Sequence, residues 1–345
     1  MTRAAKVDGV PTVASRWVLR LKAVLDAAGV SDALMPPQPW TLWARRRDLI
    51  ETPVRIAAPA PCPPVEARPR QLSVTRIETW IANPYAIFAR HVLGLEKLEE
   101  LAGDVTAALR GTIAHDILNR FTAAHPDRLP SGIESEVMAI ANALFRDYGA
   151  HPRIWAFWRP QFARFARWFA ETEPARRTDI AAAHAEVRGM LDLPGRDFRL
   201  TARADRIDAR RDGALAIYDY KTGAVPPQNQ VADLRAPQLP LEAAIAQAGG
   251  FDGIAAGPVA ALRYIRGLGR GVAGEDRAAA EAPPEALAGH ALARLSALVA
   301  RFDRADAPYP ALRRSAFKDK YRFDEYEHLA RVGEWLVAEE AAEDT

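Results

Sequence analysis

The sequence has a single cysteine, Cys62, among its 345 residues. One cysteine excludes an internal disulfide and any metal or iron–sulfur site that takes several cysteine ligands from this chain. Long apolar runs are also missing, because none approaches the roughly 20 residues that a membrane-spanning helix needs. The amino terminus, MTRAAKVDGV, has no apolar signal-peptide core. We therefore expect a cytoplasmic protein that does not enter a membrane.

A phosphate-binding loop of the form GxxxxGK[ST] is absent from the sequence. This loop is the signature of the common ATP-hydrolysing folds, because its backbone amides hold the nucleotide phosphates. We therefore expect no ATP site in this chain.

Lysine is scarce, since only six of the 46 basic residues are lysine. The formal net charge of +2 says little by itself about nucleic-acid binding. The hydrophobic content of 49% and charged content of 26% are ordinary for a globular protein. A chain of this length can form one large domain or two smaller ones.

Proline divides the amino-terminal part of the chain from the rest. Apolar residues at helical spacing predict helices over 12–29 and 40–50. The following run, 52–70, is rich in proline and is typical of a semi-rigid extended linker. We therefore expect a separate helical piece over 1–51, too short for a good core of its own, and a main domain over 71–345.

Helical and strand patterns alternate in the main domain. Thr75, followed by Glu78, is typical of a helix start, and the glycine-rich run 266–274 predicts a loop. The order of elements indicates an α/β fold with a central mixed β-sheet flanked by helices, and with extra helices at both ends of the chain. The other predicted elements are helices over 111–121, over 237–248 and from 283 onward, and strands over 185–193, 201–208, 214–221 and 259–265.

Large aromatic residues recur at spacings of three and four between Trp155 and Phe169. Aromatic side chains on one face can stack on nucleic-acid bases. A helical stripe of this period more commonly packs into a core. We therefore predict that these aromatic residues form core packing.

The strands over 201–208 and 214–221 form a predicted hairpin joined by a polar turn. Asp219 and Lys221 share one face of the second strand, one pleat repeat of roughly 6.5 Å apart. Hairpin pairing can bring Asp205 of the first strand close to Asp219. Two carboxylates and an ammonium group at one point suit a hard divalent cation such as Mg²⁺ and a phosphoryl group.

Each of these residues also has a purely structural interpretation. An Asp-x-Lys pair on a hairpin is commonly a solvated face, and a lone histidine such as His115 on a helix is commonly structural. Two features favour a function for Asp219 and Lys221. They lie on the side of Leu215 and Ile217, which a buried strand turns inward, and a merely superficial cation in this chain would more commonly be arginine.

Together these motifs resemble the PD-(D/E)XK nuclease superfamily, and within it the RecB-type branch. Each motif is weak alone, but their order and their placement on helix, strand, strand and helix form a strong combination. The motifs are Gly111-x-x-x-His115, Ala204-Asp205-Arg-Ile-Asp208, Asp219-Tyr-Lys221-Thr-Gly223 and Gln238 at the start of the next helix.

More narrowly, the chain resembles the carboxy-terminal part of an AddB-type subunit of a helicase–nuclease that processes double-strand DNA ends. Residues 1–51 loosely resemble the end of a helicase-like domain. The narrower match rests on Ser73-x-Thr75 to Asn83-Pro84-Tyr85, Pro237-Gln-Leu-Pro-Leu-Glu242 and Tyr326-Glu-His328-Leu-Ala-Arg331.

The resemblance implies a role for each matching residue. Asp205 and Asp219 would be carboxylate ligands of Mg²⁺, or of Mn²⁺, with His115 as a further ligand from the helix. Lys221 would be the catalytic lysine that acts together with Asp205 and Asp219. The substrate side would be formed by Gln238, Arg206 and Glu186.

The sequence departs from the family pattern at two points. Many AddB-type domains hold an iron–sulfur cluster with four cysteines, but Asn83 stands at the first of these positions and the tail has no cysteine. No cluster is therefore expected, and packing must fasten the tail. Glu242 stands where the wider branch often has tyrosine, which affects the substrate-side role of that helix.

The resemblance implies a Mg²⁺-dependent deoxyribonuclease, most simply an exonuclease, acting on single strands at DNA ends in repair and recombination. An AddA-type helicase–nuclease subunit would be its partner. Two alternatives stay open at this point. One is a non-catalytic DNA-binding scaffold for a partner nuclease, and the other is a free-standing RecB-like exonuclease. An intact set of His115, Asp205, Asp219 and Lys221 argues against the scaffold.

Overall fold

The structure, a computed structural model, describes residues 4, 6–7, 10–34, 39–49, 57–98, 106–147, 154–267, 273–311 and 325–335. Contacts within the chain divide it into two compact units, residues 1–55 and 56–345. Each unit is described by itself. No helix in the described ranges is both long and apolar enough to cross a membrane.

The first unit consists of short elements. Helix α1 is capped by the Ser15 hydroxyl, which accepts a hydrogen bond from the backbone N–H of Val18. None of the residues described in this unit is buried, and Trp17 is 66% exposed. Its elements are β1 (Lys6–Val7), β2 (Val10–Pro11), α1 (Arg16–Ala27), η1 (Ser31–Leu34) and α2 (Trp40–Asp48).

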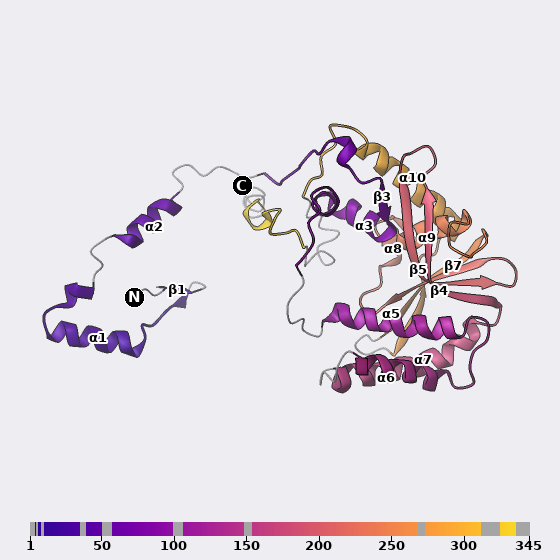
Figure 1. Ribbon diagram of the computed structural model, residues 1–345, viewed down its shortest axis with the longest axis horizontal. Coiled ribbons are helices and arrows are strands. Elements are labelled where there is room, and N and C mark those ends of the chain that lie inside the picture. The colour runs from indigo at the N-terminus through magenta and orange to yellow at the C-terminus, as the bar shows by residue number, and fades with distance from the viewer. Residues whose placement is uncertain are drawn as a thin grey trace. The chain divides into compact units, whose positions relative to one another are not determined.

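The second unit is built on a six-stranded mixed β-sheet (Figure 1). The strand order is β3-β5-β6-β7-β8, and β4 also pairs with β5. The β3/β5 and β6/β7 pairs are parallel, and the β4/β5, β5/β6 and β7/β8 pairs are antiparallel. The predicted α/β class with a mixed sheet is confirmed. The strands are β3 (Gln71–Ser73), β4 (Ile180–Asp192), β5 (Arg199–Arg210), β6 (Leu215–Lys221), β7 (Val259–Gly267) and β8 (Gly274–Ala278).

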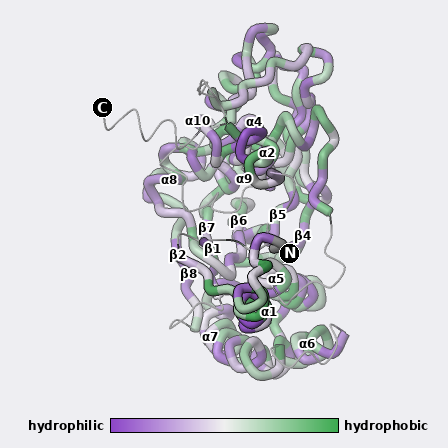
Figure 2. Tube along the Cα trace, turned by 90° about the vertical axis from the view of Figure 1, so that its left-hand side faces the viewer, coloured by the Kyte–Doolittle hydropathy of each residue, from purple (hydrophilic) through white to green (hydrophobic). Residues whose placement is uncertain are grey.

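Helices cover both faces of this sheet (Figure 1). One face packs against α3, α9 and α10, and the other against α5, α6 and α7. Hydrophobic and hydrophilic residues alternate along these helices in Figure 2, as expected when one side of a helix meets a core. The helices and helical turns are η2 (Val65–Ala67), α3 (Val74–Ala82), α4 (Pro84–Ile87), η3 (Phe88–Val92), α5 (Ala107–Ala124), α6 (Ile133–Asp147), η4 (Ile154–Trp158), α7 (Arg159–Arg176), α8 (Gln228–Ala232), α9 (Gln238–Gln247) and α10 (Pro284–Phe302).

Strand β6 lies in the middle of the sheet and is buried on both faces. Leu215 and Ile217 belong to the cluster under α9 and α10, whereas Tyr218 and Tyr220 belong to the cluster under α5 and α7. This is the predicted alternation. Because β6 has no solvent-exposed face, its Asp219 carboxylate is held inside the protein, at 2% exposure.

The aromatic stripe between Trp155 and Phe169 packs as core. Phe162, Phe165 and Phe169 are buried in α7, facing the sheet, and Trp155 packs beside them. The prediction of core packing is confirmed. These rings are therefore not a stacking platform for bases.

Several local predictions differ from the structure. Helix α3 is capped by Ser73, whose hydroxyl accepts from the N–H of Arg76, rather than by Thr75.

The predicted loop 266–274 contains the end of β7 and the start of β8. Strand β8 was missed because its sequence, GEDRA, has no apolar alternation. Helix α6 was also missed, although it buries Val137, Ala141 and Leu144 at helical spacing. The sequence also has basic residues in the tail, at Arg313-Arg314, Lys318 and Lys320, and these lie outside the described residues.

Part of the proline-rich run, residues 57–70, is packed within the second unit. The N–H groups of Tyr309 and Ala311 donate to the carbonyls of Pro61 and Pro59. Arg68 is buried, and its guanidinium donates to the Phe302 and Arg304 carbonyls at 2.7 and 2.8 Å. Residues 57–70 thus line the end of α10, and the domain limits drawn from the sequence remain a prediction.

The described tail is fastened by side-chain packing. Tyr326 and Trp335 are buried in a cluster with Tyr85 and Ala89. The Tyr326 hydroxyl donates to the Leu95 carbonyl at 2.8 Å. Side-chain packing therefore fastens the described part of the tail to the rest of the unit.

Candidate active site

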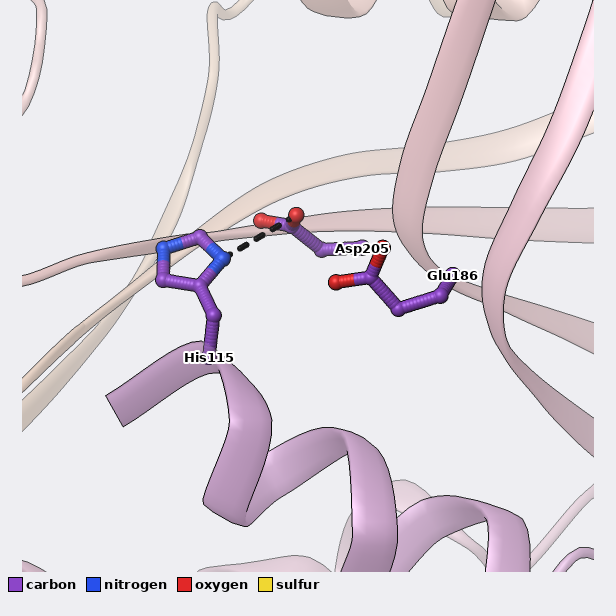
Figure 3. A group of neighbouring side chains, drawn as sticks. All are labelled: His115, Glu186 and Asp205. Carbon is purple, nitrogen blue, oxygen red and sulfur yellow. Dashed lines mark hydrogen bonds and ion pairs between the residues drawn. The ribbon is translucent and has the colours of Figure 1, made fainter. Parts of the chain in front are cut away.

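His115 reaches the sheet from helix α5 (Figure 3). The helix starts at Thr106, whose hydroxyl accepts from the Leu109 N–H. The His115 Nδ1 atom lies 3.2 Å from Asp205 Oδ1 on strand β5. The hydrogen bond ties the helix to the strand and brings together two of the residues selected from the sequence.

Asp205 stands where β5 and β6 separate. The two strands pair from Ala209↔Leu215 to Arg206↔Tyr218, and pairing ends there. The second oxygen of Asp205, Oδ2, accepts from the backbone N–H of Tyr220 at 2.8 Å. A carboxylate therefore satisfies a strand donor that has lost its ladder partner, which fixes the orientation of Asp205.

Glu186 approaches the same point from strand β4 (Figure 3). One ligand atom from each of His115, Glu186 and Asp205 lies within 4.8 Å of the others. Glu186 has a φ of 53°, a left-handed conformation that costs a non-glycine residue roughly 1–3 kcal/mol. Its carboxylate forms an ion pair with Arg203. The strained backbone aims this carboxylate at Asp205.

Asp219 is the centre of a second set of contacts. Lys221 Nζ donates to Asp219 Oδ1 at 2.9 Å and lies 2.7 Å from Oδ2. The Gln238 amide, from the start of α9, donates to the same Oδ1 at 2.7 Å. Asp219, Lys221 and Gln238, three of the residues selected from the sequence, are thus in direct contact in the structure.

Glu242 lies one helical turn beyond Gln238 and is 1% exposed. Its Oε1 accepts from the Gln238 amide at 3.2 Å. The amide therefore bridges two buried carboxyl groups, Asp219 and Glu242. At the position where the wider family often has tyrosine, this chain has an acidic side chain in contact with the site's glutamine.

Burial and like charges shape the protonation of these acids. Burial raises the pKa of Asp219, although Lys221 opposes the shift. Burial, reinforced by Asp219 and Asp205, raises the pKa of Glu242 well above its usual range. A site with so much acidic charge favours a bound cation.

Burial acts in the opposite direction on the two basic groups of the site, because it disfavours their charged forms. Burial alone would lower the pKa of Lys221, but Asp219, together with Asp205 and Glu242, outweighs burial and the pKa is raised. Burial would also lower the pKa of His115, but the hydrogen bond and charge of Asp205 outweigh it and raise the pKa. Lys221 therefore keeps its positive charge at neutral pH.

The donor set fits a divalent metal ion. An imidazole nitrogen and two carboxylate groups converge, and these are ligands that divalent cations take in proteins. Glu186 belongs to this group, whereas the family resemblance placed it on the substrate side. Asp219 lies outside the group and is held by Lys221 and Gln238.

The prediction that Arg206 binds substrate is wrong. Its side chain is fully buried on the face of the sheet covered by α7. The guanidinium donates to both oxygens of Asp208, at 2.6 and 2.7 Å, and Nη1 lies 2.8 Å from Glu173 Oε1. It also lies over the Tyr218 ring. A side chain enclosed in this way cannot reach a substrate.

Comparison with known proteins places most of the chain in one family. The PD-(D/E)XK nuclease superfamily matches residues 71–328. The chain belongs to this superfamily, whose members are nucleases that use divalent metal ions. The acidic group with His115 is a possible site for such an ion.

The similar curated proteins are uncharacterized proteins of Rickettsia. One, RC0550 of Rickettsia conorii, is 28% identical over 193 residues, covering 53% of this chain and 23% of the relative. Another, of Rickettsia felis, is 27% identical over 194 residues, covering 53% and 22%. The chain thus matches about a quarter of the length of these relatives. The crystal structure of SSO0001 aligns with 67% of this chain and 76% of its own, at 10% identity and a TM-score of 0.28.

Proposed function

We propose that this chain is the nuclease region of an AddB-type helicase–nuclease subunit, and that it hydrolyses phosphodiester bonds of single-stranded DNA at processed ends. The observation that carries the proposal is the convergence of His115, Asp205, Asp219 and Lys221 where β5 and β6 separate. A scaffold that only supports a partner would have no need to keep a half-buried lysine beside a buried carboxylate.

Asp219 and Gln238 hold Lys221 in place for catalysis. The Gln238 amide fixes the Asp219 carboxylate, and this carboxylate in turn fixes the Lys221 ammonium. The side chain of Lys221 is 28% exposed, so its charge can meet a phosphate from solvent. In this role the ammonium stabilises the negative charge that grows on the phosphate as the bond to the leaving oxygen breaks.

His115 and Asp205 would hold the divalent ion, together with Glu186, which the geometry adds, and Asp219, which the family resemblance adds. When bound, the ion would supply an activated water and neutralise charge on the scissile phosphate. We take Mg²⁺ as the natural ion, since carboxylate oxygens are the ligands it prefers. Mn²⁺ would be accepted by the same donors.

The assignment to DNA ends follows from the narrower resemblance. Its motifs include Gln238 to Glu242 and Tyr326 to Arg331, and both segments are packed in the second unit. We infer that an AddA-type helicase–nuclease subunit is the partner, because this chain has no ATP-binding loop. Exonuclease action in DNA repair and recombination, in the cytoplasm, belongs to the same proposal.

The experiment is a cleavage assay with labelled single-stranded DNA and duplex ends, each with Mg²⁺ or Mn²⁺. Wild type should cleave single strands with either ion, and Asp205→Asn should not, because this variant replaces the carboxylate that joins α5 to β6. Asp192→Asn, an exposed acid on β4, is the matched control and should cleave normally. A wild-type protein that stays inactive on every substrate, also with its partner helicase subunit present, would favour the scaffold instead.

A further inference from the structure

One face of the β4/β5 ribbon continues outward from Glu186 and Asp205. Along this face the cross-strand pairs are Arg188↔Arg203, then Met190↔Thr201, then Asp192↔Arg199. Arg188, Met190 and Arg203 are exposed. The arginine pair therefore comes directly after the acidic residues of the site, one pleat repeat of roughly 6.6 Å along the strands.

Like charges in directly opposed positions destabilise an antiparallel pair, because the two Cβ atoms are only about 5 Å apart. In the outermost pair, Asp192↔Arg199, the charges are opposite and neutralise each other. Arg199 donates to both oxygens of Asp192 at 2.6 and 3.1 Å. Arg203 pairs with Glu186, but Arg188 has no ion pair within the part of the chain that the structure describes. The ribbon thus keeps an uncompensated arginine next to the site.

From this geometry we infer that Arg188 and Arg203 form a phosphate clamp that holds the nucleic-acid backbone next to the scissile phosphate. The inference deepens the proposed function and rests on it. A guanidinium presents a planar fork of donors that matches two phosphate oxygens. A phosphodiester bound there would relieve the repulsion between the two arginines and would lie one step from Glu186 and Asp205.

The two arginines divide this task. Arg203 is anchored by Glu186, so it connects the bound backbone to the acidic group of the site. Arg188 supplies the uncompensated charge. Because phosphate contacts carry no base information, the clamp would fix the position of the strand without selecting its sequence.

The test measures binding apart from cleavage. A short fluorescent single-stranded oligodeoxynucleotide is titrated with the Lys221→Ala protein in Mg²⁺ over a range of salt concentrations. In that background Arg188→Ala should weaken binding about fivefold, as expected for an exposed ion pair. It should also flatten the plot of log K against log salt by about 0.7, the share of one phosphate contact to a single strand.

The Arg188→Glu variant distinguishes a loss of DNA binding from a loss of folding. It places opposite charges across the ribbon at Arg203, so its melting temperature should be equal or higher while its DNA affinity falls further. Arg199→Ala is the control, because it removes an exposed arginine from the same face that Asp192 already neutralises. This control should bind within twofold of the parent protein.

The inference is overturned if folded Arg188→Glu binds DNA with unchanged affinity and salt slope. It is also overturned if Arg199→Ala loses as much affinity as Arg188→Ala, because any surface arginine would then suffice. Its failure is separable from failure of the proposed function. A protein that never cleaves, but loses affinity on Arg188 substitution, would refute the nuclease proposal and support the clamp.

Discussion

At the scale of single side chains, the residues of the site divide into two sets. His115, Glu186 and Asp205 form an open group whose donor atoms face one another. Asp219 is instead enclosed between Lys221 and Gln238. The first set is suited to a cation from solvent, and the second positions a fixed charge. Asp205 is next to both, because its two oxygens contact His115 and the Tyr220 backbone.

Calorimetric titration with Mn²⁺ should separate these sets. Asp205→Asn and His115→Ala should lose most of the binding signal, because both remove a donor from the group within 4.8 Å. Glu186→Gln tests the metal ligand that only the geometry indicates, and Asp219→Ala tests the metal ligand that only the family resemblance indicates. Each substitution should weaken Mn²⁺ binding. Asp192→Asn should bind as wild type does. Unchanged binding in Asp205→Asn would remove the site as described here.

At the scale of elements, helix α7 is fixed to the sheet by buried charges. Glu173 is fully buried in α7 and contacts Arg206, Arg176 and Arg177. Burial opposes the ionisation of Glu173, but Arg206 and the other two arginines outweigh it and hold its pKa below the ordinary value. The network accounts for the position of Arg206, and it supports β5 beside Asp205.

Glu173→Gln should therefore destabilise the protein by about 3–5 kcal/mol at neutral pH, because it leaves buried guanidinium charge uncompensated. The folded pKa is depressed, so the contribution of Glu173 is fully present above its ordinary pKa of 4.5 and is lost as pH falls below that value. Urea unfolding at several pH values measures this. The difference between wild type and variant should shrink in acid, and Glu171→Gln, exposed on the same helix, should show no difference. A difference that persists in acid would contradict the assignment.

The elements of the site were largely predictable from local pattern. The period of two in β6 correctly placed Asp219 and Lys221 on the side of Leu215 and Ile217. The role of Arg206 was not predictable, because its partner Glu173 lies on a different helix and only tertiary packing brings them together. The position of Glu186 depends on one left-handed residue inside a strand, which no sequence period reveals.

At the scale of the whole molecule, the second unit gathers its site from distant segments. The described tail residues, 325–335, contribute nothing to the acidic group, but they pack on Tyr85 and Ala89 in the turns that follow helix α3. Trp335 is 3% exposed, and its indole N–H donates to the Ala330 carbonyl at 2.9 Å.

Trp335→Ala should release the tail, because emptying a buried tryptophan site costs about 3–5 kcal/mol. Amide hydrogen exchange in residues 325–335 should accelerate by about a hundredfold or more, while exchange in β5 and β6 stays slow. Leu329→Ala, which changes a largely exposed side chain in the same segment, should leave exchange unchanged. Equal protection in both variants would show that other contacts fasten the tail.

The claim on which the account depends is that the site cleaves DNA through Lys221. The most direct measurement is single-turnover cleavage of labelled single-stranded DNA with Mg²⁺ by wild type and Lys221→Ala, with binding measured in parallel and Lys22→Ala as the control on an exposed lysine. Lys221→Ala should lower the cleavage rate by about 10²–10³ and leave DNA and metal affinity nearly intact, because its charge is needed most in the transition state. Equal rates in wild type and Lys221→Ala would contradict the account.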